Sequence, residues 1–202
     1  MAKLDVSRET MADLEAFAAL VVKWTPKINL IARGTIDVIW DRHIIDSVQL
    51  YRFAPDTFVT WVDIGSGGGF PGIVMAILGK TRQPRARFVL IESDQRKATF
   101  LKSAARELSL PVTVLAGRVE NIAPQDADVV SARALAPLSG LLSLTQRHLN
   151  ADGIALFHKG RRAQQEVADA RKNWSFELED HPSITDPVAR ILAIQRIDAL
   201  GP

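Results

Sequence analysis

The stretch that decides the fold reads VDIGSGGGFPG and occupies positions 62–72. A short apolar run at 59–64 leads into it, and a helical pattern at 71–78 follows it. A glycine-rich turn between a strand and a helix is the context in which protein backbone closely approaches a nucleotide. Glycine allows the tight turn, and proline suits the first turn of the following helix. The sequence therefore predicts a nucleotide-binding turn.

This turn fits two classes of cofactor. Gly67, Gly69 and Gly72 satisfy the GxGxxG pattern of dinucleotide-binding proteins. Gly65, Gly67 and Gly69 instead form the GxGxG of methyltransferases, in which an acid precedes the first glycine by two residues, as Asp63 does here. A carboxylate is unfavourable beside a pyrophosphate, whereas S-adenosylmethionine has no phosphate and carries a cationic amine and a sulfonium. The charge of Asp63 therefore favours S-adenosylmethionine.

Beyond the turn, short β-branched runs alternate with helical patterns. The predicted strands lie at 59–64, 88–91, 112–115, 128–130, 154–158, 176–178 and 191–197, and helices are predicted at 71–78, 96–108, 138–148 and 163–173. This alternation predicts a Rossmann-like α/β fold, with a mainly parallel seven-stranded sheet and helices on both faces. No helical pattern separates the last two strands, which predicts an antiparallel pair.

The first part of the chain reads as helix. Apolar residues recur at spacings of three and four over 8–24, with Ser7 as the expected N-cap and Pro26 beyond the expected end. A second helical pattern covers 35–52 and ends before the turn signal at Pro55.

These patterns predict a helical N-terminal extension over 1–56 and a cofactor-binding core over 57–202, together forming one structural domain. His43 and Asp46 lie three residues apart, on one face of the second predicted helix. We expect this polar pair to dock the extension onto the core.

Composition excludes several kinds of site. The 202 residues include no cysteine, which excludes disulfides, thiolate metal sites and cysteine nucleophiles. The histidines show no metal-ligand spacing, so no metal site is expected. No run reaches the ~18 apolar residues of a membrane span, and the first residues resemble no signal peptide. We therefore expect a cytoplasmic protein without a membrane partner. The net charge of +2 identifies no partner by itself.

Several polar residues follow the predicted strands. Glu92 ends the second strand, about twenty residues beyond the glycines, where an acid accepts hydrogen bonds from the ribose hydroxyls of either cofactor. The segment 117–121, after the third strand, offers contacts to an adenine edge. Arg133 and Lys159 follow the fourth and fifth strands. Because ligands lie beyond the carboxyl ends of parallel strands, both are expected on the same edge as the glycines.

With these residues in place, the chain resembles the glucose-inhibited division protein B family, the ribosomal RNA small-subunit methyltransferase G proteins. The resemblance runs from about 24 to 197, and its carriers are NL at 29–30, RHIIDS at 42–47, DIGSGGGFPG at 63–72, RVE at 118–120, Ser131, Arg133, Ala134, and KG at 159–160. The RHIxDS element and the GFPG ending are far more specific than a generic glycine loop. The C-terminal strand departs from the family, whose members often end in a lysine-rich variant.

The resemblance implies methylation of a guanine at N7 in 16S ribosomal RNA. S-adenosylmethionine is the implied donor, S-adenosylhomocysteine the product, and the RNA or the small ribosomal subunit the partner of a monomeric enzyme. The expected cofactor contacts are Asp63, Gly65, Gly67, Phe70, Glu92, Val119, Glu120 and Arg133. We also expect Arg133 to position the target base, and Lys159, Arg161 and Arg162 to hold RNA phosphate.

The implied reaction agrees with what the sequence lacks. Guanine N7 carries a lone pair and no proton, so methyl transfer to it needs orientation and no general base. No catalytic acid or base is therefore predicted. The Asn/Asp-Pro-Pro-aromatic motif of exocyclic amine methyltransferases is also missing, since the fourth strand continues as SARA at 131–134.

Three other functions stay open. A small molecule or a protein is an alternative methyl acceptor. Asp63 counts against a dinucleotide-dependent oxidoreductase. A non-catalytic RNA-binding or assembly protein would bind S-adenosylmethionine without turnover on any RNA. The fold alone does not separate these functions.

Overall fold

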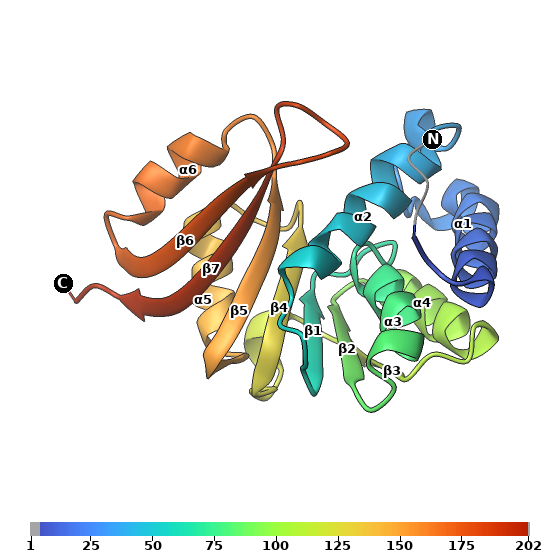
Figure 1. The fold of residues 1–202 in the computed structure, drawn as a ribbon, viewed down its shortest axis with the longest axis horizontal. Helices are drawn as coiled ribbons and strands as arrows, with labels where there is room; N and C mark the ends of the chain where they lie inside the picture. Colours follow the sequence, from blue (N-terminus) through green and yellow to red (C-terminus); the bar gives the residue numbers. More distant parts are fainter. Residues whose placement is uncertain (1–4, 202) are drawn as a thin grey trace.

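The computed structural model describes residues 5–201 and contains one seven-stranded sheet (Figure 1). Its strands, in spatial order, are β3 (Val112–Ala116), β2 (Arg87–Glu92), β1 (Thr60–Ile64), β4 (Ala127–Arg133), β5 (Leu149–Lys159), β7 (Arg190–Ala199) and β6 (Trp174–Pro182). Strands β1 to β5 pair in parallel, whereas β7 runs antiparallel to both β5 and β6. The predicted Rossmann-like sheet and its antiparallel last pair are confirmed.

Two hydrophobic clusters cover the two faces of the sheet. Trp61 of β1 belongs to the cluster that contains α3 (Gly72–Arg82) and α4 (Gln95–Glu107). Its neighbour Val62 points to the opposite face, where α5 (Leu138–Gln146) packs. Alternate residues of a strand face opposite sides of a sheet, so a strand buried on both faces is apolar almost throughout. Because β1 to β5 run in parallel, their carboxyl ends lie at the same edge of the sheet.

The N-terminal helix α1 (Arg8–Ile28) begins where the sequence predicts. Ser7 is its N-cap and accepts a hydrogen bond from the backbone N–H of Thr10. The prediction that the helix ends before Pro26 is wrong, because the proline lies inside the last turn. Proline there forgoes only one helical hydrogen bond, and the helix closes on Asn29, which is left-handed and bonds to the Thr25 carbonyl.

The second predicted helix is a series of short helical turns. They are η1 (Arg33–Thr35), the π-helical η2 (Trp40–Ile45), α2 (Asp46–Val48) and η3 (Gln49–Phe53). Helix α6 (Ala163–Ala170) and the short η4 (Val119–Asn121) complete the described elements. Isolated π turns in proteins often lie at functional sites, and η2 carries the RHII part of the RHIIDS element.

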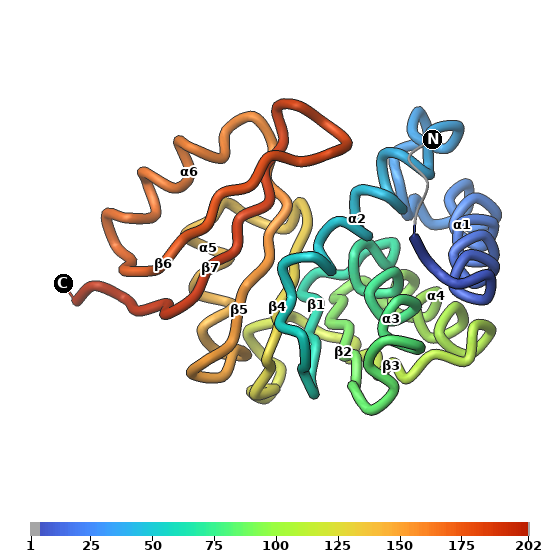
Figure 2. The backbone as a smooth tube through the Cα atoms, in the orientation of Figure 1, coloured from blue at the N-terminus to red at the C-terminus, as the bar shows by residue number. Residues whose placement is uncertain are grey.

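The extension packs directly on the sheet layer. Phe17 of α1 and Ile44 of η2 lie in the same hydrophobic cluster as Trp61. Figure 2 shows α1 beside α3 and α4. The end of the extension also reaches β6, where Phe53 of η3 stacks on His181 with ring centroids 4.3 Å apart. We propose that the extension and the core fold as one unit because they share this buried cluster. Among residues 5–201, no helix is long and apolar enough to cross a membrane.

Candidate functional site

The glycine turn (residues 65–72) leaves β1 at the open edge of the sheet. Gly67 has a φ of +53°, a value that favours glycine, and a side chain added there would meet only the turn's own backbone, 3.8 Å away. Gly65 is also left-handed, with a φ of +67°, and a methyl of Leu135 fills the place where its side chain would be. The backbone at Gly67 is therefore open to a ligand, as a nucleotide-binding turn requires.

Glu92 ends β2 beside this open backbone. It is 7 % exposed, and its Oε2 accepts a hydrogen bond from the N–H of Gly67 at 2.7 Å. Its Oε1 accepts from the N–H of Asp94, also at 2.7 Å. Each carboxylate oxygen has a further lone pair. The arrangement thus fits the predicted ribose contact, since a fixed carboxylate with spare acceptor capacity lies next to the turn.

Asp63 has a different environment from the one expected. Its side chain is completely buried, where Oδ1 accepts from the Ser131 hydroxyl at 2.7 Å and Oδ2 from the N–H of Gly72 at 3.2 Å. Burial raises the pKa of this carboxyl to about 6. The expected direct contact with a cationic cofactor group does not fit a fully buried side chain. Asp63 instead ties the glycine turn to β4 and to the first residue of α3.

Phe70, the aromatic residue of the turn, contacts three parts of the chain. Its ring centroid lies 5.1 Å from those of Phe17 and His43, both from the extension. The guanidinium carbon of Arg133 lies over the same ring at 5.2 Å, a cation–π arrangement. Since Phe70 is buried in these contacts, it links the cofactor turn to the extension and to the end of β4.

The two expected contacts after β3 differ in exposure. Val119 is buried at the start of η4. Glu120 is exposed, and its carboxylate pairs with Arg118 at 2.9 Å. The Glu120 side chain thus reaches solvent, and a cofactor contact at this position would fit the Val119–Glu120 backbone better than the carboxylate.

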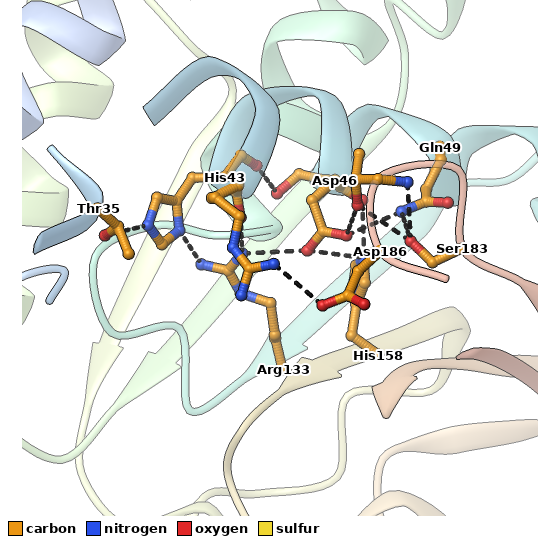
Figure 3. Close-up of polar contacts among 11 residues, drawn as sticks. Thr35, His43, Asp46, Gln49, Arg133, His158, Ser183 and Asp186 are labelled. Atoms are coloured by element: carbon orange, nitrogen blue, oxygen red, sulfur yellow. Dashed lines mark hydrogen bonds and ion pairs between the residues drawn. The ribbon is translucent and has the colours of Figure 1, made fainter. Parts of the chain in front are cut away.

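Arg133, the last residue of β4, is the centre of a polar network (Figure 3). Its Nη2 donates to Nδ1 of His43 at 2.9 Å. Its Nη1 donates to Oδ2 of Asp46 at 3.3 Å and to the carbonyl of Arg42 at 3.2 Å. Three residues of the RHIIDS element and Arg133 thus form one site, although Arg133 lies 87 residues beyond Asp46 in sequence. The predicted docking by His43 and Asp46 is confirmed, although each bonds to Arg133 and not to the other.

The hydrogen bonds of His43 determine its tautomer. The Thr35 hydroxyl donates to the Ala32 carbonyl at 2.7 Å, so it accepts from Nε2 of His43, 2.8 Å away. Nε2 therefore carries the proton, and Nδ1 is free to accept from Arg133. Burial, aided by the Arg133 charge, lowers the pKa of His43 to about 4. His43 is accordingly neutral at neutral pH, and its lone pair is already used.

Asp46 connects Arg133 to the loop between β6 and β7 (residues 183–189). Its Oδ1 accepts from the Thr185 hydroxyl at 2.8 Å and from the Gln49 amide at 2.9 Å. The same amide nitrogen donates to the Ser183 hydroxyl, and the amide oxygen of Gln49 accepts from the backbone N–H of Ile184. Nothing in the sequence pattern pointed to this loop, because its partners lie about 140 residues earlier in the chain.

A cavity of about 610 Å³ opens beside this network. It is lined by Thr35, Arg42, His43, Asp46, residues 133–137, His158–Gly160, Arg162, Glu166, Thr185, Asp186 and Ala189. Three ion pairs face it: Arg133 with Asp46, Arg42 with Asp186, and Lys159 with Glu166. The polar cavity, as we call this space, thus lies over the ends of β4 and β5 and offers both donors and acceptors.

Lys159 does not fit the expected phosphate contact. Its side chain is 7 % exposed, and Nζ donates to Oε2 of Glu166 at 2.8 Å and to the Ala136 carbonyl at 2.7 Å. A lysine whose ammonium is buried in an ion pair has little capacity left for phosphate. Arg161 and Arg162, in contrast, are exposed just beyond β5.

The comparisons with known proteins agree with this geometry. The family model described as rRNA small subunit methyltransferase G matches residues 10–191. A ribosomal RNA small subunit methyltransferase G from Cereibacter sphaeroides is 56 % identical over 95 % of this chain and 92 % of the relative. One from Ruegeria pomeroyi is 49 % identical over 95 % and 93 %.

Solved structures share the fold at low identity. A SAM-dependent methyltransferase from Aquifex aeolicus has a TM-score of 0.62 at 14 % identity, covering 78 % of this chain and 93 % of its own. A TehB-like SAM-dependent methyltransferase from Corynebacterium glutamicum has a TM-score of 0.58 at 15 % identity, covering 92 % and 99 %. With the family model spanning most of the chain and relatives near half identical, the chain belongs to the rRNA small subunit methyltransferase G family.

Proposed function

We propose that this chain methylates N7 of a guanine in the 16S RNA of the bacterial small ribosomal subunit. S-adenosylmethionine supplies an electrophilic methyl group when bound, and S-adenosylhomocysteine is the product. The observation that carries the choice of atom is the hydrogen bonding of His43, His158 and Asp46 in the polar cavity.

Neither histidine of the cavity presents a ring nitrogen that is both unbonded and accessible. Nδ1 of His43 accepts from Arg133. Nε2 of His158 lies 2.7 Å from the Asp46 carbonyl and therefore donates to it, while its Nδ1 is buried away from solvent. Both oxygens of the Asp46 carboxylate already accept hydrogen bonds. N7 of guanine needs no base, because it carries a lone pair and no proton. His43, His158 and Asp46 therefore suit this acceptor better than an exocyclic amine, which has to lose a proton.

The glycine turn and Glu92 support the placement of the cofactor. We infer that the ribose lies at Glu92 beside the open backbone of Gly67, and that the adenine lies near Val119. Gly65 and Phe70 would then border the end of the cofactor that faces the polar cavity. Asp63 supports the turn from beneath. These residues bind and orient, and Arg133, held by His43 and Asp46, presents its guanidinium at the junction of turn and cavity.

The rim of the polar cavity supports RNA binding. Arg42 and Arg162 line the cavity and are exposed, and the exposed Arg161 precedes Arg162 in the chain; cations there attract the phosphate backbone. We place the phosphate contacts on Arg161 and Arg162 and leave Lys159 to its ion pair. We further propose that one chain acts alone, since the turn and the cavity are both formed within it, and that it acts in the cytoplasm, where ribosomal subunits assemble.

The test is methyl transfer from labelled S-adenosylmethionine to small subunits from cells that lack this protein. The proposal expects label in 16S RNA, recovered as 7-methylguanine after hydrolysis. Free 16S RNA and assembly intermediates are assayed in parallel. Bound cofactor without label in any of the three RNAs would overturn the proposal. Label in a protein or small-molecule fraction would assign the acceptor elsewhere.

A further inference from the structure

Three carboxylates line the polar cavity, and their hydrogen bonding differs. Asp46 accepts at both oxygens, with Arg133 at Oδ2. Asp186 also accepts at both, from Arg42 at Oδ2 and from a backbone N–H at Oδ1. Glu166 uses only Oε2, and within residues 5–201 its Oε1 has no hydrogen-bond donor. Glu166 therefore presents the one fully available carboxylate oxygen among these three.

Glu166 is also held in place. Its Oε2 accepts from the ammonium of Lys159 at 2.8 Å and from the backbone N–H of Leu138, at the start of α5, at 2.9 Å. Its side chain is 21 % exposed, and it stands in the first turn of α6, where a negative charge is favourable. Because two donors fix Oε2, the direction of Oε1 is set before any ligand binds. Preorganisation of this kind reduces the entropic cost of binding.

A fixed free carboxylate oxygen suits the Watson–Crick edge of guanine. That edge carries an N1–H and an exocyclic amine, both donors, beside the acceptor O6, whereas N7 lies on the Hoogsteen edge of the base. Adenine has a lone pair at N1, which a carboxylate would repel. An unpaired buried polar group discriminates strongly against a ligand that lacks the matching donor. A carboxylate at N1 therefore selects guanine over adenine while leaving N7 free to react.

The same contact helps the reaction. The N7 lone pair forms the new bond to the methyl carbon, and the electrons of the broken carbon–sulfur bond return to sulfur. The positive charge thus passes from the sulfonium to the base, and no proton is released. A negative group beside the base stabilises this charge more in the transition state than in the ground state, which is the condition for acceleration.

Resting on the proposed function, we propose that Oε1 of Glu166 accepts the N1–H of the target guanine. Glu166 would thereby determine base specificity and stabilise the cationic product. Lys159 and the N–H of Leu138 position it, which gives the buried lysine a role in the site that needs no contact with phosphate.

The test compares single-turnover methyl transfer to small subunits at saturating S-adenosylmethionine. In Glu166→Gln the amide oxygen stays with the donors Lys159 and Leu138, so the NH₂ group takes the position of Oε1 and opposes the N1–H of guanine. We expect the rate to fall at least ~30-fold, the range expected for a lost hydrogen bond to a charged group. Asp169→Asn, the same change at an exposed site on α6, is expected to stay within about twofold of wild type.

A second pair of variants separates recognition from structure. Lys159→Met removes the ammonium and keeps Oε1 of Glu166. The double variant Lys159→Met/Glu166→Gln also removes the buried cation that Glu166→Gln alone leaves without a charged partner. We expect the double variant to remain as slow as Glu166→Gln. Recovery of the double variant to near the wild-type rate would overturn the proposal, because the loss would then come from the buried lysine. A Glu166→Gln rate within about threefold of wild type would also overturn it. The wild-type arm separates the two claims, since a wild type that labels no RNA contradicts the proposed function itself.

Discussion

The two ends of the open sheet edge are built in different ways. The cofactor end, at β1 and β2, comes from residues 62–94, which are close in sequence and are held by hydrogen bonds between backbone and carboxylate. The cavity end, at β4 and β5, combines the extension, two strand ends, α6 and the loop at 183–189. This fold thus carries a local cofactor site beside a proposed substrate site that exists only after distant segments have packed.

The two ends also differ in charge. Asp63 and Glu92, at the cofactor end, form no ion pair among residues 5–201 and accept hydrogen bonds from neutral groups. At the cavity end, Arg133, Arg42 and Lys159 each pair with an acid. The unpaired carboxylate of Glu92 suits a ligand rich in hydroxyls, whereas paired groups suit a neutral, polar base.

The largest effect is expected at the junction of the two ends. Arg133→Ala removes the group that bonds to both His43 and Asp46, and we expect single-turnover transfer to fall more than ~100-fold, since several oriented contacts vanish together. S-adenosylmethionine affinity should change by less than about threefold, because Glu92 is untouched. Arg196→Ala, in an exposed ion pair, is the matched control. Near-normal turnover of Arg133→Ala would show that the cavity network is only structural.

The packing beneath the cofactor end is the next target. A side chain at Gly72 would lie 2.6 Å from Oδ2 and 2.9 Å from Cβ of the buried Asp63. We expect Gly72→Ala to lower the free energy of unfolding by about 2 kcal/mol, as overpacked cores do. Gly160→Ala, with no atom within 4 Å of the added methyl, should change it little. Urea unfolding measures both, and equal effects would mean that Asp63 does not fix the turn.

A smaller effect should be confined to cofactor affinity. Glu92→Gln replaces a charged acceptor by a neutral one, and we expect S-adenosylmethionine to bind about tenfold more weakly. Isothermal titration calorimetry measures the affinity, with the exposed Glu107→Gln as control. Transfer at saturating cofactor should stay within about threefold of wild type. An unchanged affinity would contradict the proposed contact between Glu92 and the ribose.

The smallest expected effect is the pH dependence of the network. The pKa of His43 is lowered to about 4 in the folded protein. Unfolding therefore takes up a proton between pH 4 and the ordinary histidine pKa of about 6.5, and His43 makes the fold less stable as pH falls through this window. The stability advantage of wild type over His43→Gln should be largest above pH 7 and shrink toward pH 5. Thermal unfolding across this range tests it, and a constant difference would contradict the neutral tautomer.

Local features of the cofactor end were predictable from sequence. The glycine turn and the end of β2 at Glu92 follow from apolar periodicity and turn residues, which act over a few positions. The role of Asp63 was not predictable in the same way. Its partner Ser131 comes from β4, and only the folded sheet shows that these contacts bury the carboxylate.

The cavity end was predicted only in part. The sequence predicts the correct edge of the sheet for Arg133, because the carboxyl ends of parallel strands lie at the same edge. The environment of Lys159 was missed, although Glu166 stands seven residues later, because the pairing depends on how α6 packs over the end of β5. The loop at 183–189 gave no signal at all, since polar loop residues acquire a role only through contact with Asp46 and Gln49.

The central claim, that the two ends act separately, is tested most directly by the Arg133→Ala/Glu92→Gln double variant. S-adenosylmethionine affinity and single-turnover transfer at saturating cofactor are measured for wild type, both single variants and the double. We expect the double variant to have the affinity of Glu92→Gln and the rate of Arg133→Ala, each within about twofold, since separate sites give additive effects. An affinity or a rate of the double variant that departs from these values by more than about tenfold would mean that the two ends form one coupled site.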